Sequence, residues 1–347
     1  MRNSSFESNR ADRDSGGVVS MAEFSKVVVE GDGNVFRGNT CDGDGGVFAA
    51  STNSSITIEG GLFIDNSVEE NGAVIWSKGE LTVTDGNFTK NDGRENGGVL
   101  FASEFSTFTL AGGFFEGNVA KDGGVINAVM GSTVYVEAGV YSGNVAETQG
   151  GVFTIDDGAQ FKITGGNFTN NKADFGGFLY KEGAGETSCS GASILAHEAV
   201  DGGAIYAVDD ATVHWACDIR DTSAISGPAI YARANTTVVL QDMSLVDNTV
   251  ARGSVIFVTG SHLQTYQVEF SDSSRSEELS AVQVNEGSSY TAEDTSFVGF
   301  AGEAVVFSEG ELFLDNCDFS GSTSSVLVHS EPNTTAVIRN AVLGDNN

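Results

Sequence analysis

Residues 97–126 read GGVLFASEFSTFTLAGGFFEGNVAKDGGVI, and this stretch decides the fold. It begins and ends on a doublet phrase, in which two glycines precede apolar residues, as in Gly97-Gly98-Val99-Leu100. Between the doublets lie an alternating segment, Phe108-Thr109-Leu110, and an aromatic phrase in which Phe115 precedes Asn118 by three positions. Alternation with a period of two indicates β-strand, and no part offers the ten or more residues at 3.6 spacing that a helix requires.

This unit repeats along nearly the whole chain. The doublet phrase recurs every 25 to 27 residues from Gly46 to Ser280, with an early copy at Gly16 and two closer copies at Gly302 and Ser324. The aromatic phrase keeps the same period from Phe36 to Asn171, with an early copy at Phe6. Further along the chain other residues take the Asn position in some copies, namely His197, Thr222 and Ser273. Helical repeats are excluded by this all-β unit, and propeller blades need about 40 residues. Three short strands per repeat predict one coil of a parallel β-helix.

The repeat assigns positions to the inside and outside of the coil. The second residue after each doublet is apolar in every copy, which predicts an inward row; the row reads Val19, Phe48, Val74, Leu100, Ile126, Phe153, Leu179, Ile205, Ile230, Ile256, Val282, Val305 and Leu327. The doublet glycines are expected to supply tight corners with unusual φ. The Asn of the aromatic phrase is expected to hydrogen-bond to the Asn one coil away.

The two phrases, GG-[AV]-[ILVF] and F-x-x-N, resemble the repeats of the polymorphic outer-membrane protein family. The resemblance implies a right-handed parallel β-helix and a surface-exposed autotransporter adhesin. We therefore expect an all-β solenoid of about 13 coils over residues 1–347, regular over 36–283 and degenerate over 1–35 and 284–347. Both ends are in phase with the repeat and lack an obvious cap, which indicates a fragment of a longer protein; end coils that cap themselves are the alternative.

The amino-acid composition of the chain narrows the classes of molecule that it can bind. The chain carries 17 Lys and Arg against 48 Asp and Glu, a formal net charge of −31, with 45 Gly and only 2 Pro. Nucleic acid is a poor partner for so acidic a surface. No stretch approaches the ~18 apolar residues of a membrane span, and no signal peptide is visible, so we expect no membrane insertion of this segment. The resemblance implies an extracellular or cell-surface location.

Covalent modification is left open by the sequence. Cys189 and Cys217 are 28 residues apart and could form a disulfide, whereas Cys41 and Cys317 lie far from any partner in the sequence. Six N-x-S/T sequons are candidate glycosylation sites, and they stand at Asn3, Asn53, Asn87, Asn167, Asn235 and Asn333.

Catalytic and metal signals are weak. Adjacent acids occur at Asp156-Asp157 and Asp209-Asp210, both in the turn after a doublet strand, where a solvated turn explains them better than general acid/base catalysis. We assign no catalytic residue, no metal ligand and no cofactor, with calcium as the only ion that so acidic a chain favours. The histidines show no ligand spacing, and His197 takes the Asn position of the repeat.

One outer position breaks the pattern. Three residues after the second doublet residue, four consecutive coils carry aromatic side chains, Tyr180, Tyr206, Tyr231 and Phe257, and we expect them to form an exposed stripe. The stripe predicts a binding face for a glycan or protein ligand on another surface, although a self-stacking row that reinforces the sheet explains it equally simply. The sequence thus favours a non-enzymatic, adhesin-like segment or rigid spacer. The alternative is a polysaccharide-active enzyme or carbohydrate-binding module on the same scaffold.

Overall fold

The computed structural model describes residues 1–12, 15–250, 253–272, 279–302, 304–324, 326–332 and 334–343. The chain divides into two compact units, Met1–Tyr180 and Lys181–Asn347. Both units are parallel β-solenoids, and together they contain about 12 coils. No helix occurs in the described ranges. The parallel all-β solenoid predicted from the repeat is confirmed. A single continuous solenoid over 1–347 and its right-handedness stay predictions.

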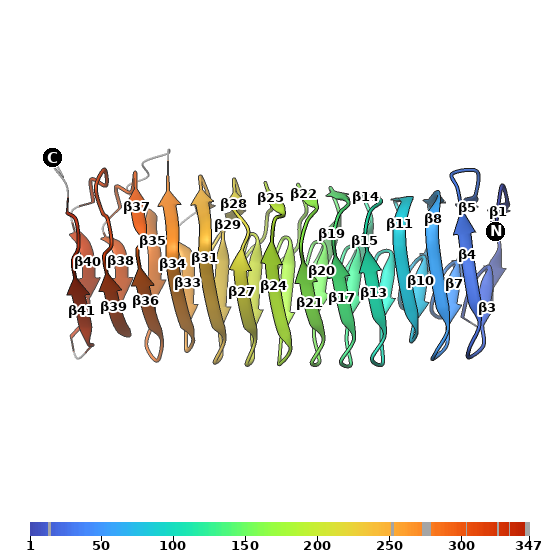
Figure 1. Ribbon diagram of the computed structural model, residues 1–347, viewed down its shortest axis with the longest axis horizontal. Helices are drawn as coiled ribbons and strands as arrows, with labels where there is room; N and C mark the ends of the chain where they lie inside the picture. Colours follow the sequence, from blue (N-terminus) through green and yellow to red (C-terminus); the bar gives the residue numbers. More distant parts are fainter. Residues whose placement is uncertain are drawn as a thin grey trace. The chain divides into compact units, whose positions relative to one another are not determined.

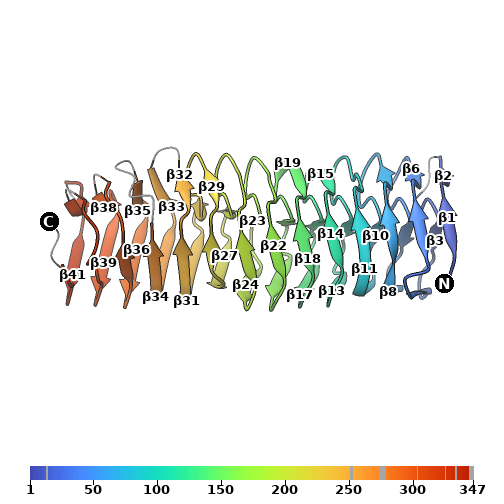
Figure 2. The same ribbon diagram turned by 90° about the horizontal axis from the view of Figure 1, so that it is seen from above.

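In unit 1 the doublet strands belong to one sheet, the alternating and aromatic strands to a second, and the short third strands form two small sheets. Strands of the same kind lie side by side in successive coils in Figures 1 and 2. The doublet strands are β3 (Val19–Met21), β7 (Phe48–Ala50), β10 (Ile75–Ser77), β12 (Leu100–Ala102), β16 (Ile126–Ala128) and β20 (Phe153–Ile155). The alternating and aromatic strands are β1 (Ser5–Glu7), β4 (Lys26–Glu30), β5 (Val35–Arg37), β8 (Ser55–Ile64), β11 (Glu80–Thr89), β13 (Thr107–Leu110), β14 (Phe114–Glu116), β17 (Thr133–Val136), β18 (Val140–Ser142), β21 (Gln160–Ile163) and β22 (Asn167–Thr169). The short third strands are β2 (Arg10–Ala11), β6 (Thr40–Cys41), β9 (Ser67–Val68), β15 (Val119–Asp122) and β19 (Val145–Gln149), which form the sheets β2-β6-β9 and β15-β19.

Unit 2 repeats this order, and β23 (Leu179–Glu182) contains the boundary between the units. Its doublet strands are β26 (Ile205–Val208), β30 (Ile230–Arg233), β33 (Gly253–Thr259), β35 (Leu279–Val284), β38 (Ala304–Ser308) and β40 (Val326–Ser330). Its alternating and aromatic strands are β24 (Glu186–Ser190), β25 (Ser193–Leu195), β27 (Thr212–Ala216), β28 (Ile219–Arg220), β31 (Thr237–Val246), β34 (His262–Ser271), β36 (Ser289–Glu293), β37 (Ser296–Val298), β39 (Glu311–Asp315) and β41 (Ala336–Arg339). The short third strands are β29 (Ser223–Ala224) and β32 (Thr249–Val250).

The core of unit 1 contains two ladders formed by the aromatic phrase, and of these the sequence predicted the Asn ladder. One ladder stacks aromatic rings with centroids 4.6–4.7 Å apart from Phe36 to Phe168, and all its rings are fully buried. The other ladder joins buried Asn side chains from Asn39 to Asn171, and each Nδ2 donates to the Oδ1 of the next coil at 2.9–3.0 Å. Because the same amide also serves backbone groups of neighbouring coils, the prediction of a hydrogen-bonded Asn ladder is confirmed.

The doublet glycines behave as expected, and they also correct the inward row. The first glycine of each doublet adopts positive φ, for example +67° at Gly97, and Gly72 does the same at +66°. Gly72 is therefore the first doublet residue of its coil, and Ile75 rather than Val74 pairs with Phe48. The sequence assignment was one residue early because Ala73 takes the place of the second glycine.

The same one-residue error affects the last two coils. Val282 pairs with Val306, and Val306 pairs with Val328, so the predicted inward residues Val305 and Leu327 each stand one position early. The error arose because Gly302 was taken as a doublet residue, although it precedes the doublet in the register that the strands adopt. Parallel hydrogen bonding, not the position of a glycine, sets which residue enters the core.

Candidate functional site

The outer side of the doublet strands in unit 2 carries the candidate site. Each coil contributes one outward residue at the same register position, and these residues pair from coil to coil. We call this set the outer row: Tyr206, Tyr231, Phe257, Gln283, Phe307 and His329. Three of the four predicted aromatic residues therefore come together. Sequence analysis missed Phe307 and His329 because of the one-residue error in the last coils. Aligning the alternating segments instead of the glycines would have found them.

The outer row is less exposed than the sequence indicated. Tyr206 is only 3% exposed, whereas the rings of Tyr231 and Phe257 are half-buried. Tyr206 stacks on Tyr231 with centroids 5.1 Å apart, and Tyr231 stacks on Phe257 at 4.9 Å. The expectation of a fully exposed stripe is thus wrong. The rings cover one another's faces, so Tyr231 and Phe257 expose only part of their surface and Tyr206 exposes almost none.

Tyr180, the fourth predicted residue, is the last residue of unit 1 and is 5% exposed. The outward position of unit 1 also contains Trp76 and Phe101, which pair directly and are both half-buried. Ile75, which precedes Trp76, is fully buried in the core, as expected for a doublet that begins at Gly72.

Polar side chains stand two positions after the outer-row residue of every doublet strand in unit 2 except β26. The Arg233 guanidinium lies 5.6 Å from the centroid of the Tyr206 ring. Gln283 donates to Asn285 at 3.0 Å, and the His329 ring lies 5.0 Å from Phe307 while its Nε2 lies 3.2 Å from Glu331. The site therefore combines ring edges with groups that donate and accept hydrogen bonds.

Burial governs the ionisation of the tyrosines. Burial raises the pKa of Tyr206 to about 12, and the nearby Arg233 charge opposes that shift. Burial also raises the pKa of Tyr231 and of the Asp201 carboxyl, which is hydrogen-bonded to Ser226. Both hydroxyls therefore stay protonated at neutral pH and act as hydrogen-bonding groups, not as nucleophiles.

The residues just before the doublets form a second polar row in unit 1. Asn71 donates to Asp44 at 2.8 Å, and Asn96 donates to Asn71 at 2.7 Å. Asn127 in turn donates to Asn96 at 2.9 Å, but within the described ranges neither Asp122 Oδ1 nor Asn127 Oδ1 has a hydrogen-bond partner. Burial raises the pKa of both Asp44 and Asp122, because their charged forms lose hydration.

The turns that connect doublet strands to alternating strands vary in length and hollow the surface. Four residues usually fill this corner, as between Ala50 and Ser55, but only Lys78 and Gly79 separate β10 from β11. At that point lies notch 1, a hollow of ≈500 Å³ bordered by Thr52–Ser55, Lys78–Glu80 and Glu104–Thr107. Unit 2 repeats the feature with Glu309 and Gly310, where notch 2 has a volume of ≈410 Å³.

The predicted acid pairs lie apart from these sites, whereas His262 and His329 belong to them. Asp157, Asp209 and Asp210 occupy exposed corner turns with positive φ, as a solvated turn requires. His197 is buried at the Asn position, whereas His262 lies in notch 2 and its Nδ1 is 2.8 Å from Ser289 Oγ. Across the described part of the chain, no three His, Cys, Asp or Glu side chains gather closely enough to hold a metal ion.

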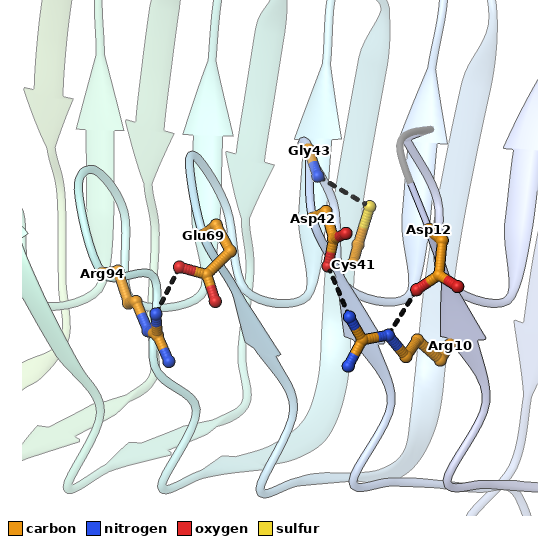
Figure 3. A network of polar contacts seen from close by, with 7 residues as sticks. All are labelled: Arg10, Asp12, Cys41, Asp42, Gly43, Glu69 and Arg94. Atoms are coloured by element: carbon orange, nitrogen blue, oxygen red, sulfur yellow. Dashed lines mark hydrogen bonds and ion pairs between the residues drawn. The ribbon is translucent and has the colours of Figure 1, made fainter.

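Charged residues also link the short third strands of unit 1. Figure 3 shows Arg10 between Asp12 and Asp42, with Arg10 Nη2 3.2 Å from Asp42, and Arg94 paired with Glu69. Cys41 lies beside this network, buried, and its Sγ accepts the Gly43 N–H at 3.3 Å. Because burial raises its pKa, the Cys41 thiol is a poor nucleophile at neutral pH.

The structure shows the state of the cysteines and the exposure of the candidate glycosylation sites. Cys189 and Cys217 form a disulfide between neighbouring coils of unit 2, which the sequence left open, while Cys41 and Cys317 are free and buried. The sequon residues Asn3, Asn53, Asn87, Asn167 and Asn235 are all exposed. Asn333 lies outside the described residues.

Comparisons with known proteins leave the family open. Among the described residues, no helix is both long and apolar enough to cross a membrane. No protein-family model, no curated protein and no solved structure matches this chain. The structure contains the parallel solenoid that the resemblance to polymorphic outer-membrane proteins implies. Because no family model matches, membership of that family stays a prediction.

Proposed function

We propose that this chain is a non-enzymatic binding segment of a secreted or surface-displayed protein, and that unit 2 contacts a glycan or protein ligand through the outer row. The observation that carries the proposal is the set of half-buried aromatic edges at Tyr231, Phe257 and Phe307, aligned from coil to coil with polar partners beside them. Stacking fixes these side chains before binding, which lowers the entropy lost on association.

The charge and the disulfide agree with this role. A formal net charge of −31 favours neutral or basic ligands and disfavours nucleic acid. The Cys189–Cys217 disulfide supports an oxidising compartment, such as the cell surface or extracellular space. A rigid solenoid also suits a spacer that holds its contact faces at fixed separation.

The test is a binding screen of the purified chain against immobilised neutral glycans and extracellular-matrix proteins. A Tyr231→Ser/Phe257→Ser variant is expected to weaken binding at least about tenfold, because two of the aromatic contacts are removed. Phe313→Ser is the matched control, since Phe313 is a half-buried outward aromatic beneath Arg339 on a different sheet. Failure of the wild-type chain to bind any probe, or an equal loss in both variants, would reject the outer row as the contact face.

A further inference from the structure

Notch 1 in unit 1 is a built feature with a cause in the sequence. Corners of four residues precede and follow it, at Ser51–Ser54 and Ser103–Ser106, while the corner between them has only two. Next to this corner, Ile75–Ser77 and Glu80–Val83 keep their register with both neighbouring coils. The missing two residues therefore leave an open space across three coils without disturbing the core.

Backbone groups on opposite walls of notch 1 lose their ordinary partners. At four other coil steps a corner N–H donates to the corner carbonyl of the next coil, as Phe105 does to Met130 at 3.0 Å and Gly131 does to Asp157 at 3.0 Å. The two-residue corner offers no such partner, and in the described ranges the Asn53 N–H and the Glu104 carbonyl form no hydrogen bond. One free donor and one free acceptor thus border the notch.

Phe105 supplies an aromatic platform at the same place. Its side chain is 81% exposed, and its backbone has a φ of +61°, at a corner position filled by Gly131 in the next coil. The ring packs against Gly131, where even a methyl group would overlap it. A bulky residue in the left-handed region costs on the order of 1 kcal/mol, and such strain is typical of functional sites.

Lys78 forms the polar floor of notch 1. Its ammonium group pairs with Glu104 and lies 5.3 Å from the centroid of the Trp76 ring, so two partners hold it in place. Glu80 adds a second carboxylate to the lining. One ammonium group against two carboxylates disfavours an anionic ligand and leaves donors and acceptors for a neutral one.

We propose that notch 1 binds a neutral pyranose ring. The C–H face of the sugar packs on Phe105, and its hydroxyls take the Asn53 N–H, the Glu104 carbonyl and Lys78. A hollow of ≈500 Å³ lies within the range of small-ligand sites. The sugar can come from a free glycan or from a glycan attached at the Asn53 sequon on the rim. This proposal does not rest on the outer row of unit 2.

The first experiment uses protein made in a host without N-glycosylation. Glucose, N-acetylglucosamine and their β-1,4-linked oligomers are titrated by saturation-transfer NMR and calorimetry. Phe105→Ala is expected to weaken binding at least about tenfold. Phe24→Ala is the control, because Phe24 is 77% exposed with a φ of +60° at an equivalent corner but does not line the notch. Equal losses in both variants would overturn the proposal.

A second variant removes the notch and keeps Phe105. Inserting Ser-Asn between Lys78 and Gly79 restores a four-residue corner, which surface turns tolerate well. Sugar binding is expected to fall at least about tenfold while the circular-dichroism spectrum and melting temperature stay unchanged. Undiminished binding in this folded variant would overturn the proposal.

A third arm separates the two sources of the sugar. Protein secreted from a glycosylating host is compared with its Asn53→Gln variant after mass-spectrometric mapping of Asn53. If the attached glycan fills notch 1, free sugar binds only the variant; if the ligand is a free glycan, both proteins bind alike. Absence of saturable sugar binding in all preparations rejects notch 1 as a pyranose site. If only the Tyr231→Ser/Phe257→Ser variant loses ligand binding, the result bears on the outer row of unit 2 and not on notch 1.

Discussion

At the scale of single residues, Phe114 and Phe115 show how much one position in a strand decides. They are neighbours in β14, yet Phe115 is fully buried in the stack of rings and Phe114 is 54% exposed. Side chains of a strand alternate between its faces, so identical residues in sequence meet opposite environments. The aromatic phrase marks Phe115 as a repeating position, because its three-residue distance to Asn118 recurs from coil to coil, and the structure shows that this position is buried.

This contrast gives a stability prediction. Phe115→Ala is expected to lower the free energy of unfolding by about 3–5 kcal/mol, since it leaves a cavity between the rings of Phe88 and Tyr141. Phe114→Ala changes it by about 0.5 kcal/mol or less. Urea unfolding followed by circular dichroism measures both. Comparable midpoints for the two variants would contradict the assignment of Phe115 to the core.

The sequence predicted the outer residues less well, for a physical reason. Alternation indicates which side chains leave the core, but it does not indicate what covers them outside. Tyr206 points outward and is still only 3% exposed, because Tyr231 covers its ring and Arg233 lies over it. Tyr206→Ala is therefore a change to packing as much as to a contact surface, and Tyr231 and Phe257 are the better probes of binding.

At the scale of elements, strand pairing was predictable and the details of the turns were not. The repeat period fixed which strands stack, whereas notch 1 depends on the absence of two residues from one corner. The corners that border notch 1 and notch 2 share a pattern, Ser77-Lys78-Gly79-Glu80 and Ser308-Glu309-Gly310-Glu311. In each, the glycine lies against the Ser carbonyl of the coil before it, where a Cβ would come within 2.2 Å of the oxygen. That pattern was readable, but its meaning required the register.

The disulfide is also an element-scale feature, because it joins Cys189 in β24 to Cys217 directly after β27. Replacing both by Ala is expected to destabilise unit 2 by roughly 3–4 kcal/mol, as estimated for closing a loop of this length in the unfolded chain. Dithiothreitol should shift the urea midpoint of the wild-type protein and leave that of the double variant unchanged. Cys317→Ala, at a buried free thiol in the same unit, is the control. A wild-type midpoint indifferent to reductant would contradict the prediction.

At the scale of the whole molecule, acidity is the dominant property. Most of the 48 acidic side chains face solvent and keep the protein soluble, but Asp44, Asp122 and Asp201 lie where burial raises their pKa. For such groups the folded state favours the protonated form. Their contribution to stability is complete below the unfolded pKa, near 3.9, and is lost as pH rises through the higher folded pKa.

The variant Asp122→Asn tests the direction of this pH dependence of stability. The variant cannot ionise, so it avoids the cost of burying a charged carboxylate and should be more stable than wild type at pH 7. The difference should shrink as pH falls toward 4, where Asp122 itself becomes protonated. Asp174→Asn, at an exposed carboxylate, is the control and should show no such trend. Paired urea titrations at several pH values measure the difference, and an advantage that grows toward acid would reverse the conclusion.

The short corner at Lys78 and Gly79 has a consequence for how such a chain can change over time. Strands β10 and β11 keep their pairing although their connection is two residues shorter than its neighbours. Insertions and deletions in corner turns therefore carve or fill cavities while the core stays untouched. A library that varies only corner length would sample new concave surfaces on a constant scaffold. The number of residues at each corner is then the property through which such a chain can evolve new binding surfaces.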